Sequence, residues 1–262
     1  MEEPQIRFDD GAAYEDFMGA WSRLAGAAFL DWLAPPPGLR WLDVGCGNGA
    51  FTEMLADRAL AADVEGIDPS PEQVAFARQR LAGRAARVQL GDAMDLPCPD
   101  ASVDAAVMAL VIFFVPDPEV GVAEMARVVR PGGSVSAYAW DILGGGFPYA
   151  ALQQAMQAQG IAPLWPPRVE AARLDALRDA WAAAGLVDVR THEIVVERRF
   201  ASFDAFWQTA RKGPRMAPRI DEISDAGRDE LRARVRASLV VDADGGITCR
   251  GVANAVRGRK PD

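Results

Sequence analysis

The sequence predicts an α/β fold built on a parallel, doubly wound sheet, and three observations predict it. Between residues 38 and 140, short runs rich in β-branched residues alternate with helical stretches, which implies right-handed crossovers between parallel strands. The strands are nearly continuous apolar runs, as expected where helices cover both faces of a sheet. A glycine-rich turn, "DVGCGNG", follows the first strand, at the edge where such folds bind ligands.

The elements of this core follow from local signals. Strands are expected over 39–45, 63–68, 86–92, 102–111 and 134–140, and helices over 48–60, 70–83 and 117–133. The second helix has the clearest start, because Ser70 can cap it, Pro71 suits its first position and Gln73 completes a capping box. The Pro131-Gly132-Gly133 run is expected to end the third helix.

Further elements flank the core. Residues 12–34 are predicted to form one or two helices, which three consecutive prolines close. Towards the end of the chain, a helix over 169–185, a strand over 187–199 and a last strand over 246–258 are expected. The intervening residues 200–245 are predicted to be mostly helical.

Composition excludes several classes of function. The net charge is −9 and the isoelectric point about 4.8, which disfavours nucleic acid as a partner. No apolar run is long enough to span a membrane, and the acidic start lacks the pattern of a signal peptide, so we expect a cytoplasmic protein. The only histidine is His192 and the three cysteines lie far apart, which argues against a metal site and a catalytic triad.

The glycine turn suggests a ligand of nucleoside type. Gly45, Gly47 and Gly49 let main chain approach a ligand closely, and the following helix directs its free N–H groups to the same place. Asp68, at the end of the second strand, is placed to accept hydrogen bonds from ribose hydroxyls. Asp92, after the third strand, is placed to accept one from an adenine amino group. A tight turn without a ligand and a nicotinamide dinucleotide site remain as alternatives.

The ordered set "LDVGCGNG", "GIDPS", "GDAMDLPCPDASVDAAVM" and "FVPDPEVGVAEMARVVRPGG" resembles the class I S-adenosylmethionine-dependent methyltransferases. Within that family it is similar to the type 11 small-molecule group, which includes enzymes of ubiquinone and menaquinone biosynthesis. The resemblance implies a Rossmann-like sheet of seven strands with the last strand antiparallel. It also implies one domain over 1–262, divided into an N-terminal helical lid (1–37), a cofactor-binding core (38–140) and a C-terminal part (141–262). Substrate lid insertions are expected in the last part near 141–168 and 200–245.

The resemblance also assigns cofactor contacts. S-adenosylmethionine is the implied cofactor, and S-adenosylhomocysteine the product. Asp43 is expected to orient the amino group of the cofactor, and Asp68 to bind its ribose. The other expected contacts are Gly45, Cys46, Gly47 and Leu110 at the methionine portion, Pro69, Asp92, Ala93 and Met94 around the adenine, and Tyr14 and Arg23 from the N-terminal helices.

Methyl transfer is an in-line displacement that requires alignment and exclusion of water more than acid–base groups. The best-placed candidate for a catalytic base or orienting group is Asp141, with a turn residue as the alternative. Phe113, Trp140, Phe147 and Trp207 are candidates for contact with a small, partly hydrophobic acceptor, such as a natural product or quinone-like ring, although packing on the sheet would equally explain aromatic residues there. His192 is expected to lie outside the site.

Two other functions compete with methyl transfer to an O, N or C atom. The chain could bind the cofactor without methylating, as a binding module or a cyclase, or it could be a nicotinamide-dependent oxidoreductase. A small-molecule substrate, no metal, no nucleic acid, no membrane partner, and a monomer or homodimer are expected.

Overall fold

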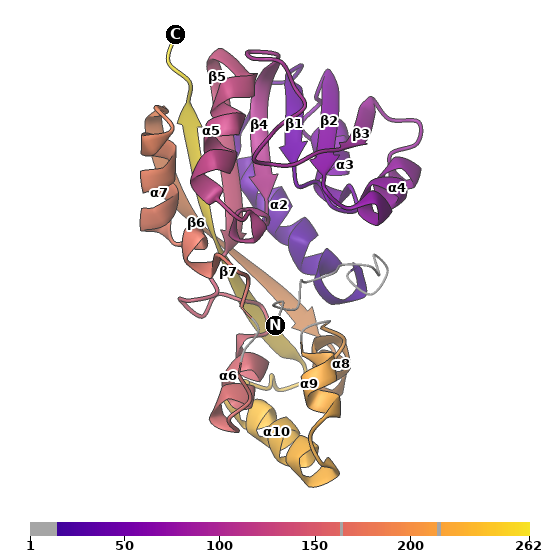
Figure 1. The fold of residues 1–262 in the computed structure, drawn as a ribbon. Coiled ribbons are helices and arrows are strands. Elements are labelled where there is room, and N and C mark those ends of the chain that lie inside the picture. The colour runs from indigo at the N-terminus through magenta and orange to yellow at the C-terminus, as the bar shows by residue number, and fades with distance from the viewer. Residues whose placement is uncertain (1–14, 163–164, 214–215) are drawn as a thin grey trace.

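The computed structural model describes residues 15–162, 165–213 and 216–262 (Figure 1). Seven strands form one sheet in the order β3-β2-β1-β4-β5-β7-β6. The strands are β1 (Arg40–Val44), β2 (Asp63–Asp68), β3 (Ala86–Leu90), β4 (Val103–Ala109), β5 (Val129–Trp140), β6 (Val187–Phe200) and β7 (Ile247–Arg259). β7 runs antiparallel to both of its neighbours, and the other pairs are parallel. The predicted α/β fold, with its antiparallel last strand, is confirmed.

Helices cover both faces of the sheet. They are α2 (Ala20–Leu33), α3 (Ala50–Asp57), α4 (Pro71–Arg80), α5 (Pro118–Val128), α6 (Ala150–Ala158), α7 (Leu174–Ala183), α8 (Phe203–Ala210), α9 (Ala217–Asp221) and α10 (Asp225–Ser238). Three short helical turns, η1 (Glu15–Gly19), η2 (Ile112–Phe114) and η3 (Val169–Ala172), complete the set. α3 contacts both α2 and α4 behind the sheet of Figure 1, and α5 contacts α7 in front of it, so the sheet is doubly wound as predicted.

Local signals set most of the boundaries. The hydroxyl of Ser70 accepts the N–H of Gln73 at 3.2 Å and so caps α4 as predicted. The prediction was wrong for the end of α5, which stops at Val128, three residues before Pro131. The reason is long-range: Val129 pairs with Val103 of β4 and so begins β5. The ammonium group of Lys260, just after β7, donates to the carbonyls of Arg127 and Val129 at 3.1 and 2.8 Å.

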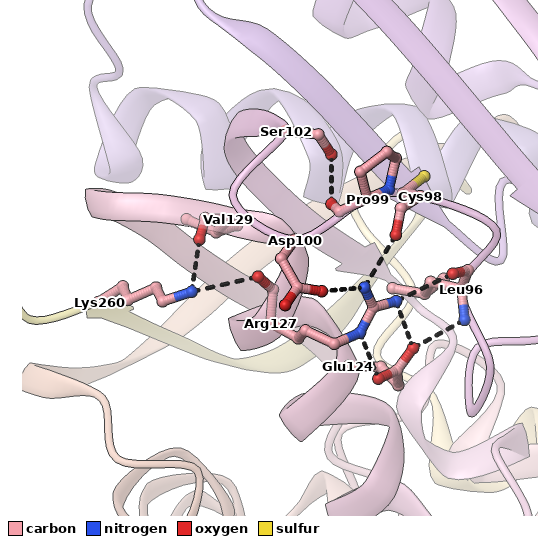
Figure 2. A network of polar contacts seen from close by, with 9 residues as sticks. All are labelled: Leu96, Cys98, Pro99, Asp100, Ser102, Glu124, Arg127, Val129 and Lys260. Atoms are coloured by element: carbon pink, nitrogen blue, oxygen red, sulfur yellow. Dashed lines mark hydrogen bonds and ion pairs between the residues drawn. The ribbon is translucent and has the colours of Figure 1, made fainter.

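Charged side chains form a hydrogen-bonded network at the end of the sheet where the parallel strands begin. Figure 2 shows Arg127 of α5 donating to Glu124, to Asp100 and to the carbonyls of Leu96 and Cys98, at 2.7 to 3.0 Å. The N–H of Leu96 donates in turn to Glu124 at 2.9 Å. This network holds the β3–β4 connection against α5 on the side of the sheet away from the glycine turn.

The predicted lid insertions form a lobe at the carboxyl end of the sheet. β6 and β7 continue beyond β5, because residues 195–200 pair with 247–252 and the pairing of β5 with β7 ends at Trp140 and Ala253. This extension and helices α6, α8, α9 and α10 are called the C-terminal lobe below (Figure 1). α6 was not predicted, whereas α8, α9 and α10 lie within the stretch 200–245 that was predicted to be mostly helical. The division into lid, core and C-terminal part stays a prediction.

Candidate functional site

The glycine turn after β1 is forced into conformations that side chains avoid. Gly45, Gly47 and Gly49 have φ angles of 73°, 51° and 79°, in the left-handed region that glycine enters without steric cost. A Cβ on Gly45 would lie 2.5 Å from the side chain of Val111. A Cβ on Gly47 would meet nothing within 4 Å, because this residue lies on the wall of a cavity.

The carboxylate of Asp68 fixes this turn from the end of β2. One oxygen accepts the N–H of Gly47 at 2.8 Å, and the other accepts the N–H of Ser70 at 3.0 Å. Burial raises the pKa of Asp68, and these two backbone donors oppose the rise. Each carboxylate oxygen retains acceptor capacity, and Asp68 lies on the cavity wall. The sequence analysis did not predict the contact with the glycine turn.

Asp43 is a fully buried carboxyl group at the same edge. One oxygen accepts the hydroxyl of Thr52 at 2.7 Å, and the other has no partner among the described residues. Burial, together with repulsion from Asp68, raises the pKa of Asp43 to about 7, and the Thr52 hydroxyl opposes the rise. A buried acceptor without a donor is costly, so this oxygen suits a donor from a bound molecule.

The glycine turn and Asp68 meet at a cavity of about 850 Å³, within the range of small-molecule and cofactor sites. It lies at the carboxyl ends of β1 to β4, where strand ends of a parallel sheet come together. Of the predicted cofactor contacts, the wall includes Arg23, Gly45, Cys46, Gly47, Asp68, Pro69, Asp92, Ala93 and Leu110. Asp43 and Met94 are not on it, and Tyr14 lies outside the described residues.

Leu110 has a distinctive backbone conformation, and Asp92 has an exposed side chain. Leu110 has a φ of 63°, a conformation costly for a branched residue and typical of functional sites. Its N–H donates to the carbonyl of Tyr138 at 2.8 Å. The exposed carboxylate of Asp92 accepts the N–H of Met94 at 2.8 Å.

Sequence reasoning missed part of the wall. The additional residues are Ser22, Asn48, Ala50, Phe51, Met54, Ile67, Ser70, Glu72, Gln73, Gly91, Ala109, Val111, Phe114, Val115, Pro116, Tyr138 and Pro167. Phe51 and Met54 carried a signal, since they share one face of the predicted helix, but core packing explained it equally well. Nothing in the sequence indicated that Pro167 lies on the wall, because a long-range contact places it there. Its neighbour Arg168 donates to the carbonyls of Phe113 and Pro116 at 3.0 and 2.8 Å, more than fifty residues earlier in the chain.

The candidates for catalysis and acceptor binding do not lie on the cavity wall. The carboxylate of Asp141 accepts the N–H of Gly144 at 3.1 Å, which fits the turn residue weighed as its alternative. Phe113, Trp140 and Trp207 are buried, and Phe147 is half-buried. Each of these four aromatic side chains packs against a neighbour. Phe113 meets Phe114 edge-on, and Trp140 lies against Gly251. Phe147 meets Tyr149, and Trp207 stacks on Phe203.

The described residues place neither a histidine nor a metal-binding cluster at the cavity. His192 is exposed and stacks on Trp32 with ring centroids 5.5 Å apart, away from the cavity wall. Cys46, Cys98 and Cys249 are free thiols, and the described part of the chain holds no metal-binding cluster of His, Cys, Asp and Glu. None of its helices is long and apolar enough to cross a bilayer.

Known proteins resemble the chain in the same region. Residues 42–137 match the Methyltransf_11 family, described as a methyltransferase domain. An uncharacterized methyltransferase of Mycobacterium bovis is 42% identical over 104 residues, which are 40% of this chain and 41% of that protein. The demethylmenaquinone methyltransferase of Deinococcus radiodurans is 40% identical over 115 residues, 43% of this chain and 46% of its own length. The chain thus aligns with less than half of each of these curated relatives.

A solved structure extends the likeness in fold to nearly the whole chain. A phosphoethanolamine N-methyltransferase of Haemonchus contortus, in complex with phosphomonomethylethanolamine and S-adenosylhomocysteine, has a TM-score of 0.60 at 19% identity. The superposition covers 97% of this chain and 58% of that one. At this identity it supports the fold alone. Residues 42–137 are thus similar to methyltransferase domains of the type 11 group.

Proposed function

We propose that the protein transfers the methyl group of S-adenosylmethionine to an O, N or C atom of a small, partly hydrophobic acceptor. The observation that carries the proposal is that one cavity gathers the glycine turn, Asp68 and Asp92 at the ends of three adjacent strands. A ligand with a charged tail, a ribose and an adenine needs this order of groups. An acceptor of quinone or natural-product type is part of the proposal, supported by the demethylmenaquinone methyltransferase relative.

The residues on and beside the cavity wall suit the cofactor. We assign the ribose hydroxyls to Asp68, which keeps acceptor capacity on the wall, and the adenine amino group to Asp92. Pro69, Ala93 and Met94 are assigned to the adenine ring. Pro69 and Ala93 are on the wall and Met94 adjoins it.

The methionine portion is assigned to the other side of the cavity. Bare main chain at Gly47 admits a close approach there, since a Cβ on it would meet nothing within 4 Å. Gly45 also lies on the wall, and Leu110 presents its backbone from the end of β4. The unpartnered oxygen of Asp43 is assigned to the amino group of the cofactor, directly or through water. Arg23 of α2, which lies on the wall, is assigned to a cofactor contact at the rim of the site. Tyr14 lies outside the described residues, and its contact with the cofactor stays an expectation.

The cofactor, when bound, supplies an electrophilic methyl group on a sulfonium. The chain orients it, positions the acceptor and excludes water. The thiol of Cys46 is no competing nucleophile, because burial and the nearby carboxylates Asp43 and Asp68 raise its pKa far above neutrality. Since the only histidine, His192, is not on the wall, the acceptor is expected to bring its own nucleophilicity.

The proposed setting is a cytoplasmic monomer or homodimer acting on a metabolite rather than on nucleic acid or membrane. The acidic net charge of −9 supports the exclusion of nucleic acid.

The test is transfer of labelled methyl from S-adenosylmethionine to a panel of phenols, hydroquinones, carboxylic acids and amines. The proposal predicts label in at least one class of acceptor. Saturable binding of S-adenosylhomocysteine with no transfer to any member would instead support a cofactor-binding protein without methyltransferase activity.

A further inference from the structure

The inner face of β6 carries an arginine between apolar residues. Ile194, Val196 and Phe200 are buried, and Arg198 shares their face because side chains alternate along a strand. Arg198 pairs in register with Cys249 of β7, which is buried as well. Arg198 itself is half-buried and lies on the strand face that the apolar set turns into the C-terminal lobe.

The surroundings of Arg198 are aromatic. Its guanidinium lies over the ring of Phe200, 4.5 Å from the centroid, and Phe200 meets Phe206 of α8 edge-on at 5.4 Å. The ring of Tyr149 also meets Phe206, with centroids 5.9 Å apart, so Arg198, Phe200, Phe206 and Tyr149 form one continuous cluster. Burial raises the pKa of Tyr149 to about 12 and that of Cys249 to about 11, and the charge of Arg198 opposes both rises.

One guanidinium nitrogen of Arg198 is buried and has no hydrogen-bond partner among the described residues. Its neighbour Arg199, on the outer face, is in contrast paired with Asp242 and Asp244. Leaving a charged donor buried without an acceptor costs more than leaving it in water. An acceptor oxygen from a bound molecule would satisfy this guanidinium nitrogen and so account for its position.

Tyr149 connects this arginine to the cofactor cavity. The hydroxyl of Tyr149 accepts the indole N–H of Trp21 at 3.2 Å and donates to the carbonyl of Phe17 at 2.8 Å. Trp21 directly precedes Ser22 and Arg23, which lie on the cavity wall. The lobe lies at the carboxyl end of the sheet (Figure 1), and the cavity lies at the carboxyl ends of β1 to β4.

We propose that Arg198 binds an anionic oxygen group, a carboxylate or a phosphate ester, of the methyl acceptor. The planar fork of a guanidinium matches such groups with two parallel hydrogen bonds. Phe147, which is half-buried beside Tyr149, suits the apolar body of the same molecule. The acceptor is then an amphipathic acid. This proposal rests on the proposed function for the identity of the ligand, though not for the presence of the anion site.

The experiment is calorimetric titration with matched probes: 4-hydroxybenzoate, 4-hydroxybenzamide and phenyl phosphate, each with and without saturating S-adenosylhomocysteine. The wild-type protein is expected to bind at least one anionic probe more tightly than the neutral amide. Arg198→Met is expected to weaken that binding about tenfold or more, since a charge-assisted hydrogen bond is lost. Arg198→Lys is expected to retain part of it. The two anionic probes distinguish carboxylate from phosphate.

Arg199→Met is the matched control, because it removes a neighbouring arginine from the outer face and should leave binding unchanged. Arg198→Met should also keep the thermal stability of the wild type and its affinity for S-adenosylhomocysteine, whereas a merely structural arginine would lower the melting temperature. Equal binding of acid and amide by the wild type, no binding of either anion, or undiminished binding by Arg198→Met overturns the proposal. If Arg198→Met does not fold, Arg198→Lys decides by the same comparison. Failure of the proposed function would be recognised separately, because the wild-type protein would then not bind S-adenosylhomocysteine.

Discussion

Carboxyl groups at the two ends of the sheet have pKa values shifted in opposite directions. At the amino end, Asp104 of β4 accepts the backbone N–H and guanidinium of Arg40 and the guanidinium of Arg130, at 2.6 to 3.2 Å. These donors hold the pKa of Asp104 well below its usual range, although burial opposes them. At the carboxyl end, burial raises the pKa values of Asp43 and Asp68 instead.

This difference separates stability from function. Carboxylates that are paired with arginines contribute to folding, as in the Arg127 network of Figure 2. Carboxylates that are buried with unused acceptor capacity are costly in the free protein and gain from a ligand. The contrast can be tested by substitutions at matched positions on the two ends.

The largest expected effect is the pH dependence due to Asp43. Its folded pKa of about 7 lies above the unfolded value of about 3.9, so the folded state keeps a proton that the unfolded state releases. The free energy of unfolding should therefore fall as pH rises from about 4 to 7, by up to about 4 kcal/mol. Urea unfolding at several pH values should show this fall in the wild type and not in Asp43→Asn. The same slope in both proteins would contradict the assignment.

Next come the glycines that flank β1. At Gly45, after the strand, a methyl group meets both an unfavourable φ and Val111 at 2.5 Å. At Gly38, before the strand, φ is 81° but nothing lies within 4 Å. Gly45→Ala should destabilise the protein by about 3 kcal/mol and Gly38→Ala by about 1 kcal/mol, measured by thermal unfolding. Equal losses would mean that Val111 moves aside freely.

A smaller effect is expected on cofactor affinity from Asp68. Asp68→Asn removes a charged acceptor, and S-adenosylhomocysteine should bind about 2 kcal/mol more weakly, roughly thirtyfold. Asp63→Asn is the control, because Asp63 stands at the other end of β2 and pairs with Arg87. It should bind the cofactor like the wild type. If the two variants bind equally, Asp68 does not hold the ribose.

The smallest expected effect comes from Asp104. Its lowered pKa stabilises the folded state above about pH 4, and this contribution is lost as pH falls through the folded pKa. Because Arg40 and Arg130 are half-exposed, Asp104→Asn should cost about 1 kcal/mol at pH 7. Acid unfolding of wild type and variant should converge at low pH, while affinity for S-adenosylhomocysteine stays unchanged. A loss of that affinity would break the division between the two ends.

The fold and the strand-end positions of the cavity could be predicted because local patterns determine them. Alternating strand and helix signals place Gly45, Asp68 and Asp92 at strand ends, and strand ends of a parallel sheet share one edge. The end of α5 could not be predicted, since it depends on the pairing of Val129 with Val103 of β4. The aromatic residues of the lobe were also beyond reach: Trp207 has a helical pattern that fits core packing and ligand contact equally.

The central claim is that the cavity beside the glycine turn binds an adenosyl cofactor. Calorimetric titration of the wild-type protein with S-adenosylhomocysteine, and separately with NAD, tests it most directly. The account predicts saturable one-to-one binding of S-adenosylhomocysteine and no heat of binding with NAD at the same concentrations. Tight binding of NAD without any response to S-adenosylhomocysteine would contradict it.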